Sequence, residues 1–141
     1  MPWLVADVLL YCADYSQEFV RVDKKILIVD DSPSQVRLMQ DLLVHEGYRP
    51  VGLSDPHKVE ETITNERPCV ILLDVVMPDR NGFQLCRELK NNAEFRGIPV
   101  ILVTSKGTAS DKFWGQQQGA DDYITKPFTR EELLRAVRRF A

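Results

Sequence analysis

The chain has 141 residues, of which 44% are hydrophobic and 28% are charged, and its formal net charge is -3. This length and this apolar content are enough for one domain with a hydrophobic core of its own. The slightly acidic charge, with no local cluster of Lys and Arg, excludes the basic surface that nucleic-acid-binding proteins use. We therefore expect no direct contact with DNA.

The cysteines and the first residues of the chain predict where the protein works. Cys12, Cys69 and Cys86 are odd in number and show no C-x-x-C spacing, so they favour neither a disulfide framework nor a zinc site. Residues 1–12 are apolar, but an acid interrupts them and no basic residue precedes them, so they fit neither a signal peptide nor a membrane-spanning helix. The sequence therefore predicts a reduced, cytoplasmic protein without a membrane partner.

Residues 1–22 precede the domain, which we expect to span residues 23–141. Leu4, Tyr11 and Phe19 fall on one face if this segment is helical. Such an amphipathic helix would dock on the domain or on a second copy of the chain, which gives a possible dimer. A disordered start is the alternative, and the sequence does not decide between the two.

The first predicted strand ends on charges. Residues 26–29 are apolar without a break, as in a central strand that is covered on both faces. Asp30 and Asp31 follow it directly. Residues 33–46 then have helical spacing, with a proline suited to the first turn and Gly47 to the end. A single acid or Ser in this place most often caps the helix that follows.

The alternation of strand and helix continues to the end of the chain. Four more strands are expected at residues 49–54, 69–74, 98–105 and 122–125, and four more helices at residues 55–66, 83–92, 108–119 and 129–140. Thr129 and Glu132 have the spacing of a capping box, and either Phe113 or Trp114 should pack its helix onto the sheet. Buried strands that alternate with crossover helices predict an α/β fold, a parallel sheet with helices on both faces.

Polar residues stand where these strands end. Ligands of parallel sheets bind outside the carboxyl ends of the strands. The strand ends carry Asp30, Asp31, Asp74, Thr104, Ser105 and Lys126. Crowded carboxylates repel each other unless a cation intervenes, and oxygen ligands at an open edge suit Mg²⁺. A lysine and a hydroxyl opposite that cation are the groups that a phosphoryl group needs.

Four stretches together resemble the receiver domain of two-component response regulators. They are ILIVDDSPSQ, ILLDVVMPDRNG, VILVTS and ADDYITKPF, in the order usual for the family. The resemblance covers residues 23–141 and implies the flavodoxin-like (βα)5 fold, a doubly wound parallel sheet with strand order 2-1-3-4-5. It also implies a signalling protein that catalyses only its own phosphoryl transfer and dephosphorylation, not an enzyme with a separate substrate.

The resemblance assigns roles to residues. Asp74 matches the acceptor of a phosphoryl group from a sensor histidine kinase or a phosphotransfer protein. The implied Mg²⁺ ligands are Asp31, Asp74 and the backbone carbonyl of Val76, with Asp30 helping mainly through water. Lys126 and Thr104 would face the phosphoryl oxygens. The peptide bond between Lys126 and Pro127 is cis in relatives.

The family also implies a switch. Movement of Thr104 toward the phosphoryl group lets Tyr123 turn inward, which changes the face that the helix at 108–119, the last strand and the last helix present to a downstream target. Val76 and Lys106 depart from the common pattern at positions that flank the path of the attacking water. They are expected to change the lifetime of the phosphate.

Two features narrow the role. The chain ends after the closing helix, so we expect a stand-alone receiver whose output is docking. Residues 111–128 resemble single-domain regulators of chemotaxis-like systems that control twitching motility. A flavodoxin is disfavoured because Asp30 and Asp31 would repel its phosphate. A haloacid-dehalogenase-type phosphatase would need a second acid at Val76, and a phosphate-independent pseudo-receiver stays as the alternative.

Overall fold

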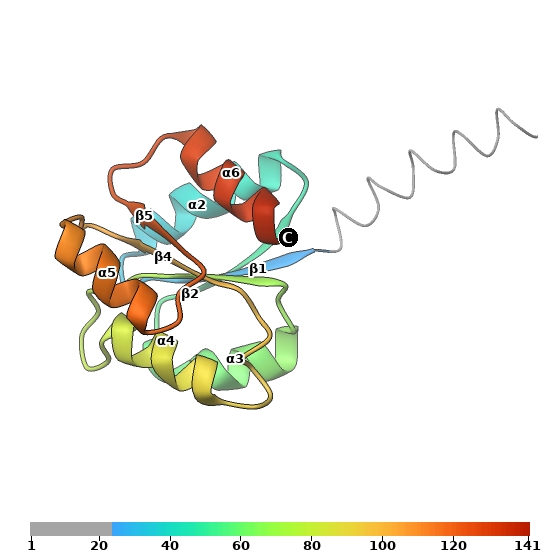
Figure 1. The fold of residues 1–141 in the computed structure, drawn as a ribbon. Coiled ribbons are helices and arrows are strands. Elements are labelled where there is room, and N and C mark those ends of the chain that lie inside the picture. Colours follow the sequence, from blue (N-terminus) through green and yellow to red (C-terminus); the bar gives the residue numbers. More distant parts are fainter. Residues whose placement is uncertain (1–23) are drawn as a thin grey trace, which may run out of the picture.

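The unbroken apolar runs of the sequence form the strands of one parallel sheet. The computed structural model describes residues 24–141, and its strand order is β2-β1-β3-β4-β5 (Figure 1). The strands are β1 (Lys25–Val29), β2 (Arg49–Leu53), β3 (Val70–Leu73), β4 (Val100–Thr104) and β5 (Asp122–Thr125). This is the flavodoxin-like order 2-1-3-4-5, so the predicted fold class is confirmed.

Helices cover both faces of this sheet. Within the described residues they are α2 (Pro33–His45), the short 3-10 helix η1 (Pro56–Lys58), α3 (Val59–Glu66), α4 (Gly82–Asn91), α5 (Ala109–Gln117) and α6 (Arg130–Phe140). Figure 1 shows α2 and α6 on one face and α3, α4 and α5 on the other. Each of the five helices expected between residues 33 and 140 is present, although the one expected at 55–66 begins as a 3-10 turn.

Two apolar cores, one on each face of the sheet, hold these layers together. Successive residues of a strand point to opposite faces. Ile26 and Ile28 of β1 therefore enter the core under α2 and α6, and Leu27 and Val29 enter the opposite core. All four are at most 1% exposed. Burying one such side chain stabilises the fold by about 2 kcal/mol, so the run at 26–29 must lie in the centre of the sheet.

Capping residues fix several helix starts. The side chain of Thr129 accepts a hydrogen bond from the Glu132 N–H at 3.1 Å, as its spacing predicted. A complete capping box, which sequence analysis missed, starts α5: Thr108 accepts from the Asp111 N–H, and the Asp111 carboxylate accepts from the Thr108 N–H. These caps satisfy backbone N–H groups that have no partner within the helix.

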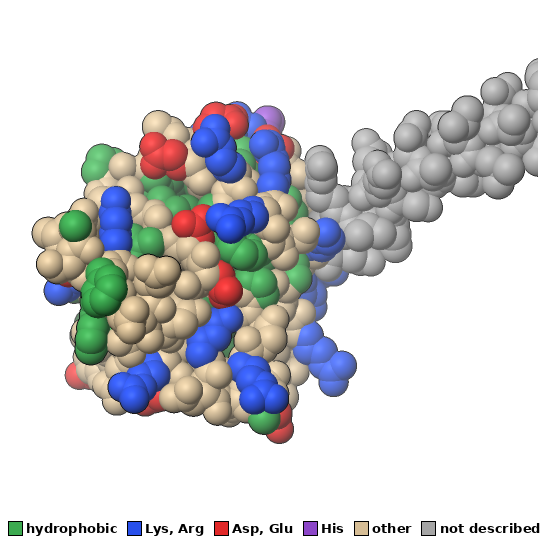
Figure 2. Space-filling view, viewed as in Figure 1, with side chains coloured by type: hydrophobic (Ala, Val, Ile, Leu, Met, Phe, Trp, Pro, Cys, Tyr) green, Lys and Arg blue, Asp and Glu red, His purple; other side chains and the backbone are tan. Residues whose placement is uncertain are grey.

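The expectation that an aromatic side chain packs α5 onto the sheet is wrong. Phe113 and Trp114 are 61% and 52% exposed, and hydrophobic side chains form a patch over α5 in Figure 2. Gly115 is instead the buried residue of this helix. The residue of α5 that is buried against the sheet is therefore a glycine, which has no side chain.

Two further expectations concern the ends of the chain and membranes. The segment 1–22, predicted as a docking helix or a disordered start with a possible role in a dimer, lies outside the described residues. Between residues 24 and 141, no helix is both long and apolar enough to cross a lipid bilayer.

Candidate functional site

Three aspartates meet at the carboxyl edge of the sheet. Asp30 and Asp31 follow β1, and Asp74 follows the neighbouring strand β3. One carboxylate oxygen from each lies within 4.8 Å of the others. Asp30 and Asp74 are only 1% and 7% exposed, whereas Asp31 is exposed to solvent. The cluster is thus buried on one side and open on the other, which fits a cation that keeps some of its water.

The acids do not serve as helix caps. Ser32 occupies the N-cap position of α2, but its side chain makes no capping hydrogen bond. The Ser32 N–H instead donates to Asp30 Oδ1 at 2.9 Å, which holds that carboxylate beside the site. The simple capping interpretation of Asp31 and Ser32 therefore does not explain the acids at this strand end.

Lys126 lies between two of the carboxylates. Its Nζ is 2.5 Å from Asp30 Oδ2 and 3.5 Å from Asp74 Oδ2. The lysine follows β5, and the peptide bond between Lys126 and Pro127 is cis, as the resemblance to receiver domains implied. An ammonium in this position offsets the repulsion between the acids. Sequence analysis placed Lys126 opposite the metal but did not foresee its ion pair with Asp30.

Two hydrogen bonds connect Thr104, which lies beside Asp74, to Tyr123. Thr104 is the buried last residue of β4, and its hydroxyl lies close enough to Asp74 to lower the pKa of that carboxyl. The same hydroxyl accepts from the Lys106 N–H at 3.4 Å. The Tyr123 hydroxyl donates to the Lys106 carbonyl at 2.5 Å. The two residues predicted as a switch are therefore joined through the backbone of Lys106, while Ser105 beside them is exposed.

Burial has the largest effect on the charge of Asp74. It raises the pKa of this carboxyl, because the charged form loses hydration. The positive charge of Lys126 lowers the pKa and the negative charge of Asp30 raises it, and the net shift is upward. The negative charge of ionised Asp74 is therefore only partly neutralised in the folded domain, and an added cation would stabilise it.

Comparison with known proteins identifies this arrangement. Residues 26–138 match the model of the response regulator receiver domain. The chain belongs to the response regulator receiver domain family. Receiver domains are signalling proteins that bind Mg²⁺ at an acidic pocket, accept a phosphoryl group and interact with histidine kinases or phosphotransfer proteins.

Individual relatives span most of this receiver domain. Protein PilH of Pseudomonas aeruginosa strain PAO1 is 42% identical over 113 residues, which are 80% of this chain and 93% of PilH. The chemotaxis protein CheY4 of Vibrio cholerae superposes with a TM-score of 0.77 at 28% identity, covering 84% of this chain and 98% of CheY4. The receiver domain of the Pseudomonas aeruginosa sensor histidine kinase PA1611 was solved with magnesium in its active-site cleft. It gives a TM-score of 0.75 at 30% identity and covers 83% of this chain and 96% of that domain.

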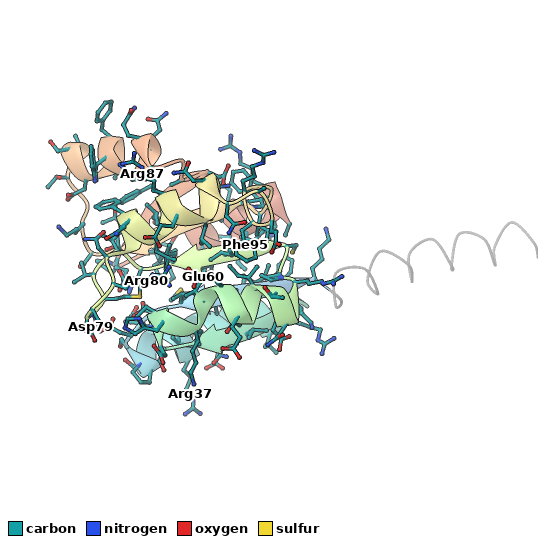
Figure 3. All side chains as sticks on the ribbon, turned by 90° about the horizontal axis from the view of Figure 1, so that it is seen from below. Arg37, Glu60, Asp79, Arg80, Arg87 and Phe95 are labelled. Atoms are coloured by element: carbon teal, nitrogen blue, oxygen red, sulfur yellow. The ribbon has the colours of Figure 1, made fainter. Side chains whose placement is uncertain are left out.

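The loop after Asp74 in this receiver domain is anchored by an arginine that sequence analysis missed. Arg80 donates to the Pro56 carbonyl at 2.8 Å, to both carboxylate oxygens of Glu60 and, at 2.8 Å, to Glu88. Figure 3 shows Arg80 beside Glu60, between α3 and α4. These ion pairs raise the pKa of Arg80. No signal in one sequence reveals them, because the partners are 20 and 8 residues away on other helices.

The raised pKa of Asp74 has a consequence for stability in Mg²⁺-free buffer. Because the native pKa exceeds the ordinary value of 3.8, the folded domain holds this proton more tightly than the unfolded chain does, and stability falls as the pH rises through the native pKa. We expect Asp74→Asn to unfold at a higher urea concentration than wild type at pH 7, and the difference to shrink as the pH falls below that pKa.

Urea unfolding at several pH values tests this expectation, with Asp41→Asn as the control because Asp41 is an exposed acid on α2. A lower unfolding midpoint for Asp74→Asn than for wild type at pH 7 would contradict it.

Proposed function

We propose that this receiver domain accepts a phosphoryl group on Asp74 from a phosphohistidine of a sensor histidine kinase or a phosphotransfer protein. One observation carries the proposal: the Asp74 carboxylate lies beside two further carboxylates, a lysine ammonium and a threonine hydroxyl at the open edge of the sheet. We assign Mg²⁺ binding to Asp31, Asp74 and the backbone carbonyl of Val76, with Asp30 acting mainly through water.

The chemistry follows from these groups. A carboxylate oxygen of Asp74 attacks phosphorus, the phosphorus–nitrogen bond of the phosphohistidine breaks, and an acyl phosphate forms while the imidazole leaves with the electron pair. Bound Mg²⁺ supplies positive charge to the phosphoryl oxygens. Lys126, 3.5 Å from the acceptor carboxylate, supplies a second positive charge. The Thr104 hydroxyl donates a hydrogen bond to a phosphoryl oxygen, on which negative charge builds up during the transfer. Catalysis by the protein is confined to its own phosphoryl transfer and dephosphorylation.

The output is a change of the surface formed by α5, β5 and α6. Thr104 moves toward the phosphoryl group, and Tyr123 follows through the backbone of Lys106, to which both residues are hydrogen-bonded. A downstream protein docks on the altered surface. The similarity to PilH supports a role in twitching motility or related chemotaxis-like signalling. Val76 and Lys106 are exposed beside the site and are placed to influence water attack on the phosphate.

Binding of beryllium trifluoride tests the proposal, because this tetrahedral anion bonds to a carboxylate oxygen as a phosphoryl group does. We expect wild type with Mg²⁺ to give protein-bound ¹⁹F resonances and Asp74→Asn to give none. Bound signal in Asp74→Asn would remove Asp74 from the acceptor role. No signal in wild type would favour the phosphate-independent pseudo-receiver.

Asp31 offers a separate test of the metal ligands. It is the exposed member of the acid cluster, so replacing it should remove a ligand without leaving a buried group unpaired. We expect Asp31→Asn to weaken Mg²⁺ binding about 100-fold, as measured by amide shifts in an NMR titration. Asp41→Asn makes the same chemical change at an exposed site on α2 and should leave the affinity unaltered. Equal affinities in the two variants would exclude Asp31 as a ligand.

A further inference from the structure

Gly115 occupies a position in α5 where alanine would be the better helix former. It is the buried residue of that helix, and its neighbours Phe113 and Trp114 turn outward. Glycine lowers the stability of this helix, so we expect a neighbouring group to exclude a larger residue at position 115. That group is a side chain of β5, the strand that Gly115 faces.

The ring of Tyr123 fills the space that a side chain at position 115 would need. A Cβ built on Gly115 would lie 2.9 Å from both Cδ2 and Cε2 of Tyr123 and 3.0 Å from Cδ1 of Leu102. Contacts this short force a neighbour to move. The Leu102 methyl is the end of a flexible side chain, whereas the Tyr123 ring is rigid and starts from a strand paired with β4.

The same ring position determines a hydrogen bond in the neighbouring loop. From this position the Tyr123 hydroxyl reaches the Lys106 carbonyl at 2.5 Å. The Lys106 N–H also donates to the hydroxyl of Thr104, the residue that lies beside Asp74 and lowers its pKa. Displacing the ring would release the Lys106 carbonyl and uncouple this loop from β5.

We propose that Gly115 is a positioning residue, whose missing side chain admits the Tyr123 ring and thereby couples α5 and β5 to the Lys106 loop at the acceptor site. This inference rests on the proposed function for its regulatory meaning. Its geometric part stands without it, since the ring contacts exist in the protein before any phosphoryl group is added.

The test compares Gly115→Ala with wild type by NMR. In Gly115→Ala we expect loss of the cross-relaxation between the Tyr123 ring and the Leu102 methyls, and loss of most of the beryllium-trifluoride-induced amide shifts in β5 and α6. Binding of the anion itself should change by less than about threefold, because Gly115 does not contact the acid cluster. Gly97→Ala is the control, since a Cβ at Gly97 meets nothing within 4 Å.

A Tyr123→Ala background separates this role from a general loss of packing. There the ring is absent, so Gly115→Ala should raise the folding equilibrium constant about fivefold through helix propensity, whereas with Tyr123 present it should lower the constant. The same change in both backgrounds, or ring contacts and induced shifts in Gly115→Ala that equal those of wild type, would overturn the proposal. Absence of anion binding in wild type would instead overturn the proposed function, and the ring contacts would still decide the role of Gly115.

Discussion

Replacing Lys126 by Met is expected to lower the free energy of unfolding by about 3 kcal/mol at neutral pH. Asp30 is 1% exposed and has the Lys126 ammonium 2.5 Å from its carboxylate. Methionine keeps the apolar stem of lysine but leaves the Asp30 charge buried beside Asp74 without that partner. The loss therefore comes from unpaired charge and not from a cavity.

The same variant should bind Mg²⁺ about tenfold more tightly, because removal of one positive charge strengthens the attraction of the three carboxylates for a cation. Added Mg²⁺ should then restore more stability to Lys126→Met than it adds to wild type. Urea unfolding with and without Mg²⁺ measures both effects.

Lys25→Met is the matched control for this prediction. Lys25 pairs with Glu66 at 2.9 Å, but the two side chains are 29% and 38% exposed, so its loss should cost about 1 kcal/mol or less. Equal losses of stability in the two variants, with no extra gain from Mg²⁺ for Lys126→Met, would show that Lys126 does not neutralise the acid cluster.

Gly82→Ala is expected to lower the free energy of unfolding by at least about 3 kcal/mol. A Cβ at Gly82 would lie 2.1 Å from the Asp74 carbonyl oxygen and 2.5 Å from Val75 Cα. Both are backbone atoms, so no rotamer change relieves the contact. The start of α4 would have to move away from the end of β3, which breaks the hydrogen bond of 2.9 Å from the Gly82 N–H to the Val75 carbonyl.

Calorimetry or urea unfolding of Gly82→Ala measures this loss, with Gly97→Ala as a glycine that has open space around it. If Gly82→Ala does not fold, Gly82→Ala in a background stabilised by Asp74→Asn allows the same comparison. A midpoint for Gly82→Ala within error of that for Gly97→Ala would show that the close approach of α4 to Asp74 is not required.

The sheet could be predicted from sequence because its central strands are apolar without a break. An unbroken apolar run is expected where a strand is buried on both faces, and the side chains of residues 26–29 do alternate between the two cores. That the acids at the strand ends lie together could also be predicted, since the carboxyl ends of parallel strands meet at one edge of the sheet. The structure brings Asp30, Asp31 and Asp74 together at that edge.

Pairings between distant side chains could not be predicted in the same way. Lys126 and Asp30 are 96 residues apart, and which oxygen the ammonium contacts depends on the side-chain conformations at that edge. The orientation of α5 was predicted wrongly because its buried position is Gly115, which has no side chain for a hydropathy pattern to register. The aromatic residues beside it therefore indicated the wrong face.

Intact mass after incubation with acetyl phosphate and Mg²⁺ tests the central claim most directly, because it reports covalent transfer to the chain itself. We expect one added phosphoryl group on wild type and none on Asp74→Asn, and no added group on wild type that is incubated with acetyl phosphate and a chelator in place of Mg²⁺. A phosphoryl group on Asp74→Asn, or an unmodified wild type under conditions that label another receiver domain, would contradict the assignment of Asp74 as the acceptor.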